Sequence, residues 1–325
     1  MALPLIGLDI GGTKCALIRA GLDGAIVDVT TFPTAGVDAT LEKYYSLISR
    51  MDLREPSVFG ISCGGPLDTA TGLILSPPNL PGWDGIPITA ELERRFGGRA
   101  FLMNDANAGA LAEWQYGAGR GFHNIVFLTS GTGMGAGFIL DGRLYEGTSG
   151  MAGEVGHMRL APDGPVGYGK AGSFEGFCSG GGIAQLAQAR ARELGGAVAF
   201  NPGRIGGITT RDVGLAAARG DTEAREVFAA AGRYLGMALA VIVDFLNPQR
   251  IIIGSVYARC GAFIAPAMRE TLEREALAQS LRDCEIVPAA LGEDIGNYAA
   301  IAAARYKMGK FDAEGILPQK ERTPQ

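Results

Sequence analysis

Two kinds of residue stand out as able to do chemistry: carboxylates and paired glycines that follow apolar segments. The first group comprises Asp9, Gly11, Gly12, Thr13 and Lys14. Glycine has no Cβ, so backbone N–H groups can approach phosphate oxygens, and the threonine adds a hydroxyl donor. Asp9 is placed to hold Mg²⁺ through water, because this ion keeps much of its hydration shell and takes one or two carboxylates. The alternative is a tight hairpin in which Asp9 only satisfies turn amides.

A second glycine turn follows another apolar segment. Its central residues are Gly131, Thr132 and Gly133. Neither turn has the GxxxxGK[ST] pattern, and neither opens a helix as a dinucleotide-binding fingerprint must. Two such turns facing one another across a cleft predict a nucleotide site of another kind.

A third candidate is the pair Asn104 and Asp105, which lies between an apolar strand-like run and a helical run. A hydroxyl that attacks phosphorus needs a general base within hydrogen-bond reach, and a carboxylate can take that role. Asp105 is therefore the predicted base. Either residue could instead cap the helix that follows, and the two roles are compatible.

These residues need strands and helices to position them. Apolar runs of strand length alternate with segments of helical periodicity, which predicts an α/β fold with mixed sheets flanked by helices. The predicted strands are Leu5–Ile10, Cys15–Ala20, Val58–Ser62, Ala100–Met103, Asn124–Thr129, Gly135–Leu140 and Arg250–Ile253. The predicted helices are Ala39–Arg50, Thr89–Phe96, Ala106–Tyr116, Gly180–Leu194, Asp212–Ala218, Thr222–Phe245, Ala265–Ser280 and Asn297–Met308.

An internal similarity links two of these regions. Ile6–Gly24 and Val126–Gly142 both read as strand, glycine-rich turn, strand and Asp-Gly turn. A repeat of this kind indicates two related halves that each contribute one glycine turn. Glycine turns between apolar strands are also common in unrelated α/β proteins.

Length and composition restrict the class of protein. A chain of 325 residues exceeds the usual size of one domain, so two domains are expected. The net charge of -5 and the lack of a Lys/Arg run argue against nucleic acid or an acidic membrane as partner. Five cysteines without a CxxC pair indicate reduced thiols. With no signal-like start and no expected membrane span, we predict a cytoplasmic protein.

The sequence resembles the ROK family of sugar kinases and repressors, within the actin-like ATPases, from Gly7 to about Ala304. The most specific part is a run that reads CGGPLD at residues 63–68 and SPPNLPGW at residues 76–83, similar to the family's sugar-side loops. The resemblance implies two actin-like (ribonuclease H-like) domains with a ligand cleft between them. We assign residues 1–116 plus about 295–325 to the first domain and 117–294 to the second, larger domain.

The resemblance also implies ligands and their residues: a hexose, ATP and Mg²⁺, bound by a chain that forms a homodimer. The residues implied for the sugar are Gly65, Asn79, Asn104, Asp105, Glu154, His157 and Glu175. Gly254 and Ser255, where the family has a second glycine, are placed beside the adenosine. Trp83 could contact the sugar as an apolar plate or pack in the core.

The family's structural zinc is not expected here. In the family the equivalent of His157 and three cysteines bind this ion, but the cysteine positions here are Val166, Tyr168 and Ser173. Valine cannot bind zinc, and one histidine cannot make a tetrahedral site. We expect the loop to be held by packing of Val166, Tyr168 and Phe174 instead.

Together these features predict an ATP-dependent hexose kinase that phosphorylates a sugar hydroxyl, the 6-hydroxyl of glucose being the first choice. Three alternatives stay open: a kinase for fructose, mannose or an N-acetylhexosamine, a catalytically silent sugar sensor, and another actin-like phosphotransferase. A repressor would need a DNA-binding helix-turn-helix ahead of the first strand, and we expect no room for one after Met1.

Overall fold

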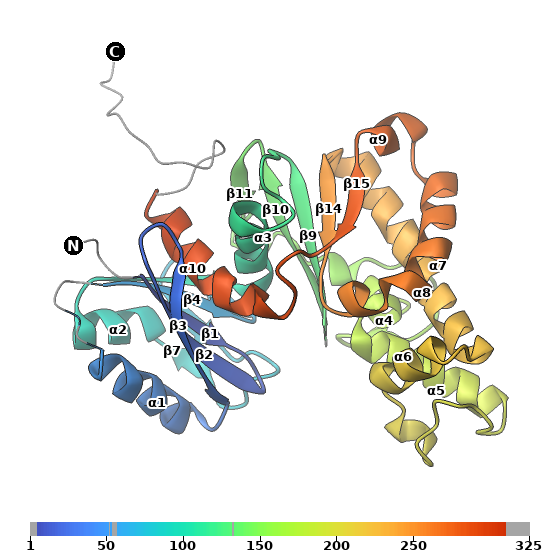
Figure 1. The fold of residues 1–325 in the computed structure, drawn as a ribbon, viewed down its shortest axis with the longest axis horizontal. Coiled ribbons are helices and arrows are strands. Elements are labelled where there is room, and N and C mark those ends of the chain that lie inside the picture. The colour runs from blue at the N-terminus through green and yellow to red at the C-terminus, as the bar shows by residue number, and fades with distance from the viewer. Residues whose placement is uncertain (1–4, 52, 54–56, 132, 310–325) are drawn as a thin grey trace. The chain divides into compact units, whose positions relative to one another are not determined.

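The computed structural model describes residues 5–51, 53, 57–131 and 133–309. The chain divides into two compact units (Figure 1). The first takes described residues from Met1–His123, Gly137–Ala152 and Glu293–Gln325, and the second takes Asn124–Ala136 and Gly153–Gly292. The chain therefore passes between the units several times, and segments 117–123 and 137–152 belong to the first unit.

The predicted α/β class with mixed sheets is confirmed. The strands are β1 (Leu5–Ile10), β2 (Lys14–Ala20), β3 (Ile26–Pro33), β4 (Val58–Cys63), β5 (Leu67–Asp68), β6 (Leu73–Leu75), β7 (Asp84–Ile86), β8 (Arg99–Asn104), β9 (Ile125–Ser130), β10 (Met134–Leu140), β11 (Arg143–Tyr145), β12 (Val166–Gly167), β13 (Lys170–Ala171), β14 (Arg250–Ile253) and β15 (Glu285–Pro288). The α-helices are α1 (Val37–Ser49), α2 (Ile88–Phe96), α3 (Asp105–Tyr116), α4 (Phe174–Cys178), α5 (Gly180–Glu193), α6 (Thr210–Ala218), α7 (Thr222–Leu246), α8 (Val256–Glu275), α9 (Ala278–Arg282) and α10 (Ile295–Lys307). Short 3-10 turns lie at Val155–His157, Ile205–Gly207 and Gly292–Asp294.

The two large sheets have the same strand order. The first runs β3-β2-β1-β4-β8 and the second runs β11-β10-β9-β14-β15. In the first sheet β1, β4 and β8 are parallel and β2 and β3 are antiparallel to their neighbours. In the second, β9, β14 and β15 are parallel and β11 is antiparallel to β10. This shared order supports the duplication that the sequence repeat predicted.

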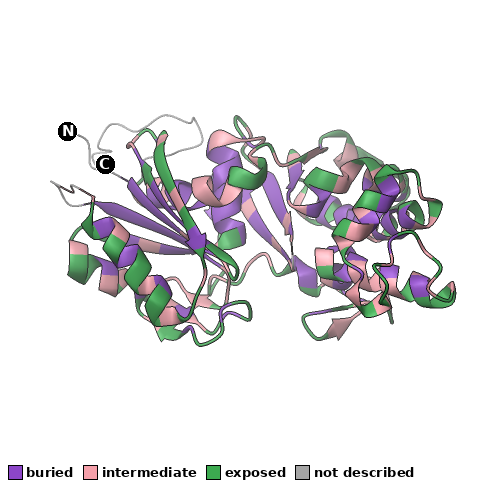
Figure 2. Ribbon diagram, turned by 60° about the horizontal axis from the view of Figure 1, so that its bottom comes forward, coloured by how far each residue is buried: buried purple, intermediate pink, exposed green. Residues whose placement is uncertain are grey.

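Helices cover both faces of the first sheet. Side chains of α1 and α2 pack on one face, where Tyr44, Ile48 and Leu92 are fully buried. Helix α10 covers the other face and lies so close that a Cβ at Gly60 would overlap the Ala300 carbonyl oxygen. Figure 2 shows the central strands of both sheets as almost wholly buried. The apolar runs that predicted these strands are therefore the core of each sheet.

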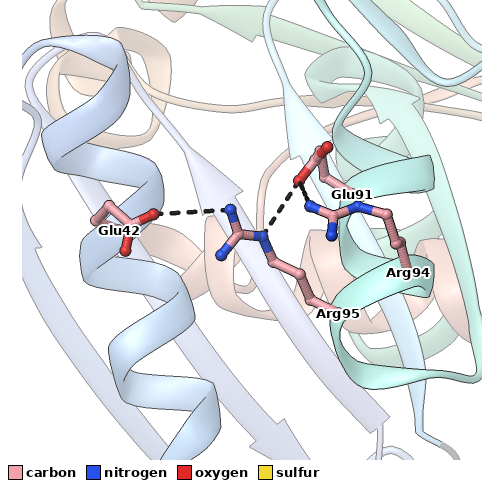
Figure 3. A network of polar contacts seen from close by, with 4 residues as sticks. All are labelled: Glu42, Glu91, Arg94 and Arg95. Atoms are coloured by element: carbon pink, nitrogen blue, oxygen red, sulfur yellow. Dashed lines mark hydrogen bonds and ion pairs between the residues drawn. The ribbon is translucent and has the colours of Figure 1, made fainter.

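A surface network joins α1 to α2. Arg95 binds Glu91 at 3.2 Å and Glu42 at 3.8 Å, and Arg94 binds Glu91 at 2.7 Å (Figure 3). The Arg95 guanidinium also lies over the Tyr45 ring, 4.1 Å from its centroid. Exposed ion pairs contribute little to stability, so this network chiefly fixes the packing of the two helices.

Helix α7 was predicted over Thr222–Phe245, and the structure extends it by one residue to Leu246. Among the described residues it is the helix that could cross a membrane by length and composition, but 61% of its most apolar window is buried inside the protein. Gly232 and Gly236 face α8, where an added Cβ would lie 2.5 Å from the carbonyl oxygens of Ile264 and Met268. Its glycine face therefore belongs to the core of the second unit.

One predicted helix boundary is wrong. Helix α8 begins at Val256, nine residues before the predicted start, and Pro266 lies inside it. Proline disfavours the interior of a helix because it has no N–H group to donate. Packing against α7 holds α8 together despite the missing N–H group.

Candidate active site

The carboxyl ends of three parallel strands bring the predicted acid–base residues together in the first unit. Ile10 on β1 pairs with Cys63 on β4, which pairs with Asn104 on β8. Asp9 and Asp105 therefore lie at the same edge of the sheet, on either side of Cys63. The carboxyl edge of parallel strands is the usual place for a ligand site in open α/β sheets.

The two carboxylates influence each other. Burial raises the pKa of Asp9 from 3.8 to about 6; the charge of Asp105 adds to this shift, and Lys14 partly offsets it. The Asp105 side chain reaches solvent, yet surrounding protein atoms raise the pKa of its carboxyl, and the hydrogen bond from the Ala106 N–H opposes that shift. Neighbouring carboxylates that resist ionisation are typical of catalytic sites.

The first glycine turn is fixed by hydroxyl groups from the elements behind it. Tyr44 on α1 donates to the carbonyl oxygen of Asp9 at 2.7 Å. Thr34 donates to the carbonyl oxygen of Gly11 at 2.5 Å, and its own N–H donates to Thr13. The side chains of Thr13 and Lys14 stay exposed beside this turn. Our sequence analysis missed Tyr44 and Thr34, because nothing in their spacing separates them from ordinary core and turn residues.

The sugar-side loop meets the first glycine turn. A Cβ at Gly12 would lie 2.5 Å from the carbonyl oxygen of Asn79, so only glycine allows this approach. Asn79 itself is exposed. At the other end of the loop, a Cβ at Gly65 would lie 3.5 Å from Nδ2 of Asn104. The structure thus brings Gly12, Asn79, Gly65, Asn104 and the two carboxylates into one region of the first unit.

Trp83 does not belong to this site. Its side chain is 1% exposed and packs in the core cluster under β6 and α1. Of the two roles considered for Trp83, packing in the core is the one that the structure shows.

Asn104 caps the helix that follows it, which is one of the two roles considered for this residue. Its Oδ1 accepts hydrogen bonds from the N–H groups of Ala106 at 2.9 Å and Asn107 at 3.4 Å, so it caps α3. The cap uses only the side-chain oxygen. The Nδ2 group, which faces Gly65, is the part of Asn104 that could donate to a ligand hydroxyl.

The second glycine turn belongs to the second unit and is held by a carboxylate. Oε2 of Glu175 accepts a hydrogen bond from the Met134 N–H at 3.0 Å. A Cβ at Gly133 would lie 2.9 Å from the same oxygen. The Gly131 carbonyl accepts from the Gly180 N–H at 2.8 Å. Thr132 lies outside the described residues. Glu175, predicted as a sugar ligand, is therefore also a support for this turn.

Ser255 lies close to the second turn in a strained conformation. A Cβ at Gly131 would lie 3.7 Å from Ser255 Oγ, and Gly254 donates its N–H to the Leu128 carbonyl at 2.9 Å. The backbone of Ser255 has φ 54° and ψ -113°, a region that residues with a side chain rarely adopt. The structure thus brings Gly254 and Ser255 to the second glycine turn.

Glu154 and His157 flank a short 3-10 turn, and both side chains are exposed. The His157 ring makes an edge-on contact with Tyr168, with 5.5 Å between ring centroids. Glu154, His157 and Glu175 belong to the second unit and Asp105 to the first. Their role with sugar stays a prediction.

The expected packing of the loop in place of zinc is wrong for two of its three residues. Val166 is 48% exposed and Tyr168 is 68% exposed, while Phe174 is fully buried. Val166 begins the two-stranded ribbon β12–β13, and Tyr168 lies in the turn between its strands. Within the described part of the chain, no group of three or more His, Cys, Asp or Glu side chains could hold a metal ion.

Comparison with known proteins gives the family. The sequence profile of the ROK family matches residues 5–306. This chain belongs to the ROK family. A glucokinase of Halalkalibacterium halodurans is 32% identical over 90% of this chain and 92% of its own length. An N-acetylmannosamine kinase of Shigella flexneri is 31% identical over 81% of this chain and 86% of its own length.

Solved structures of ROK proteins share the fold. A ROK glucokinase from Streptomyces griseus, in complex with glucose and AMPPNP, has a TM-score of 0.77, 29% identity and coverage of 93% of this chain and 99% of that chain. A ROK transcriptional regulator, a homologue of the Escherichia coli MLC protein, has a TM-score of 0.82 and 25% identity, covering 94% of this chain and 79% of that chain. The family thus includes both enzymes and regulators.

Proposed function

We propose that this ROK protein is an ATP-dependent hexose kinase that phosphorylates the 6-hydroxyl of glucose. The single observation that carries the proposal is Asp105 at the carboxyl edge of β8, beside Asp9 and a glycine turn. The relationship to glucokinases supports a sugar substrate. The similar N-acetylmannosamine kinase keeps N-acetylhexosamines as alternative substrates.

The residues of the first glycine turn fit a nucleotide with magnesium. Gly12 leaves open a space that a Cβ would fill against Asn79, and the Asp9 carboxylate ends the strand before the turn. ATP with Mg²⁺ would supply the phosphoryl group and neutralise part of its charge. Asp9 is the residue that would hold the ion through water, since protein carboxylates bind magnesium in this way.

Asp105 is the proposed general base. A carboxyl whose pKa is raised is a better proton acceptor than an ordinary surface carboxylate. Asp105 Oδ1 accepts the Ala106 N–H at 2.8 Å, which fixes the orientation of the carboxylate at the start of α3. In the proposal, the other oxygen takes the proton of the sugar hydroxyl, and Asn79 and Nδ2 of Asn104 orient the sugar.

The test is a coupled assay of ADP release with MgATP across a panel of hexoses and N-acetylhexosamines. We expect sugar-dependent turnover, with Asp105→Asn lowering kcat by about 10² to 10⁴-fold because proton transfer is lost. The matched control is Asp28→Asn, which removes an exposed carboxylate from β3. Turnover that survives in Asp105→Asn would contradict the assigned base.

A silent sugar sensor is the second candidate, because a ROK regulator shares this fold. Calorimetry separates the two: sugar binding without turnover of any panel member would favour the sensor. Cytoplasmic location and a homodimer stay predictions, which cell fractionation and sedimentation of the purified chain would test.

A further inference from the structure

The segment from His157 to Ser173 holds the position where the family implies structural zinc, and its residues do not fit that ion. Valine has no donor atom at position 166. The Ser173 hydroxyl is fully buried and accepts the Gly176 N–H at 3.1 Å, so it serves as the cap of α4. The remaining pair, His157 and Tyr168, cannot supply the four nitrogen or sulfur ligands that a structural zinc site uses.

Side chains bind the backbone of this segment where a metal would otherwise tie it together. Gln185 on α5 makes two bonds to Val166: its Nε2 donates to the carbonyl oxygen at 2.9 Å and its Oε1 accepts the N–H at 2.9 Å. Arg159 donates to the carbonyl oxygen of Ala171 at 2.8 Å. Lys170 donates to the carbonyl oxygen of His157 at 2.5 Å. These bonds join both ends of the segment and its ribbon.

The hydrogen bonds of this segment and its buried side chains differ in how much they contribute to stability. A hydrogen bond of this kind contributes far less to stability than a structural zinc ion does in a small domain. The hydrogen bonds therefore cannot supply the folding energy of a metal. That energy comes from burial: Phe174 is fully buried, and Phe177 stacks on Tyr234 with 3.4 Å between ring centroids. What the hydrogen bonds can supply is position.

Gly167 follows Val166, the residue that Gln185 binds, and it packs against Glu175, which supports the second glycine turn. A Cβ at Gly167 would lie 2.7 Å from Cβ of Glu175 and 2.6 Å from the N atom of Gly176. Glu175 in turn accepts the Met134 N–H. A continuous series of contacts thus runs from Gln185 through the ribbon to the carboxylate and the turn, all inside the second unit.

We infer that Gln185 is a positioning residue: without a metal ion, its carboxamide holds the β12–β13 ribbon and keeps Glu175 against the second glycine turn. The inference assigns Gln185 no contact with substrate. It predicts that the folded chain needs no zinc and that the geometry of the turn depends on this one amide.

The experiment uses the full chain and two readouts that do not depend on activity. Protein from zinc-supplemented medium is analysed for metal content and melted with and without EDTA. We expect far less than one zinc per chain and an unchanged melting temperature. Hydrogen–deuterium exchange is then followed at Met134, whose N–H binds Glu175. We expect Gln185→Ala to speed this exchange about tenfold, because local opening becomes easier.

Gln188→Ala is the matched control, because Gln188 lies one turn further along α5 and donates to the Ile208 carbonyl at 3.2 Å. It should leave exchange at Met134 unchanged. If Gln185→Ala fails to fold, Gln185→Glu keeps the acceptor for the Val166 N–H and should show a smaller increase in exchange. One zinc per chain with a lower melting temperature in EDTA, or equal exchange in both alanine variants, would overturn the inference.

The kinetic consequence rests on the proposed kinase function. In Gln185→Ala the KM for ATP should rise roughly fivefold, with the KM for sugar unchanged, because the perturbed turn is the one expected to bind phosphate. A general loss of folded protein would instead lower kcat and leave both KM values alone. Absence of any kinase activity, together with the expected exchange, would reject the proposed function and leave the positioning role intact.

Discussion

The two sheets share a strand order and a glycine turn after their first strand, but they support those turns by different means. In the first unit, the neutral hydroxyls of Tyr44 and Thr34 bind the backbone around the turn. In the second unit, the Glu175 carboxylate is itself the support, through the Met134 N–H. The first turn is thus held by neutral hydroxyls and the second by a carboxylate.

This difference follows from what each half would do. Support by neutral hydroxyls leaves the Asp9 carboxylate out of the bonds that hold the first turn, whereas Glu175 takes part in holding the second. In the first unit, burial and the nearby charge of Asp105 raise the pKa of Asp9. We therefore expect the first half to serve proton transfer and metal binding, and the second half to present N–H groups to an anionic ligand.

The comparison predicts that Asp9 destabilises the first unit increasingly as pH rises. Its folded pKa is about 6 against 3.8 for an ordinary aspartate, so the folded state binds the proton more tightly than the unfolded state does. The contribution of Asp9 to the free energy of unfolding should be most favourable below pH 4 and fall by roughly 3 kcal/mol as pH rises through 6. Asp9→Asn removes this dependence and should be more stable than the parent above pH 6.

Tryptophan fluorescence in urea, from pH 4 to pH 8, measures this effect. Trp83 and Trp114 are the chain's two tryptophans, and both are buried in the first unit. Fluorescence therefore reports the unfolding of the unit that contains Asp9. A stability difference between Asp9→Asn and the parent that stays constant over this pH range would show that the buried charge has no such cost.

The two turns should differ in their tolerance of a methyl group. At Gly12 the added Cβ meets the backbone of Asn79, which cannot move without moving the loop, and a shift near 1 Å costs about 100-fold in rate. At Gly133 it meets the far end of the Glu175 side chain, which can rotate, so we expect about a tenfold loss or less.

Steady-state kinetics of Gly12→Ala and Gly133→Ala test this order. Gly36→Ala is the control, because no atom lies within 4 Å of an added Cβ there and its φ of -59° suits alanine. Equal losses at both turns would mean that the support by Glu175 is as rigid as the backbone contact at Gly12, contrary to the comparison.

The sequence was informative where a residue's neighbours in the chain determine its surroundings. Asp9, Asn104 and Asp105 each follow an apolar run, and parallel strands place their ends together, so this cluster could be expected. The ROK resemblance identified the family and located Glu175 and Ser255. Strand β3 was missed because it is largely exposed and has neither a continuous apolar run nor a regular alternation.

Features that depend on distant contacts could not be read from the sequence. Gln185 looks like any polar residue on an amphipathic helix until the ribbon that it binds is placed beside it. Tyr168 was expected to pack because it is large and apolar, but the two-residue hairpin loop turns it toward water. The positive φ of Ser255 is equally invisible, because a serine before a helix ordinarily predicts a normal cap.

Relief of the backbone strain at Ser255 is the smallest change in stability that we expect. Its conformation, with φ 54° and ψ -113°, costs on the order of 1 to 3 kcal/mol for a residue with a side chain. Ser255→Gly removes this cost but loses about 0.4 to 1 kcal/mol because the unfolded chain gains freedom. We expect a net stabilisation of about 1 kcal/mol, measured by urea unfolding followed by circular dichroism of the helices.

Ser255→Ala keeps the strained backbone and deletes the hydroxyl, so it should give no gain. A Ser255→Gly variant less stable than the parent would mean that the hydroxyl beside Gly131 holds the second turn more firmly than the strain loosens it, and the two turns would then both depend on side-chain oxygens.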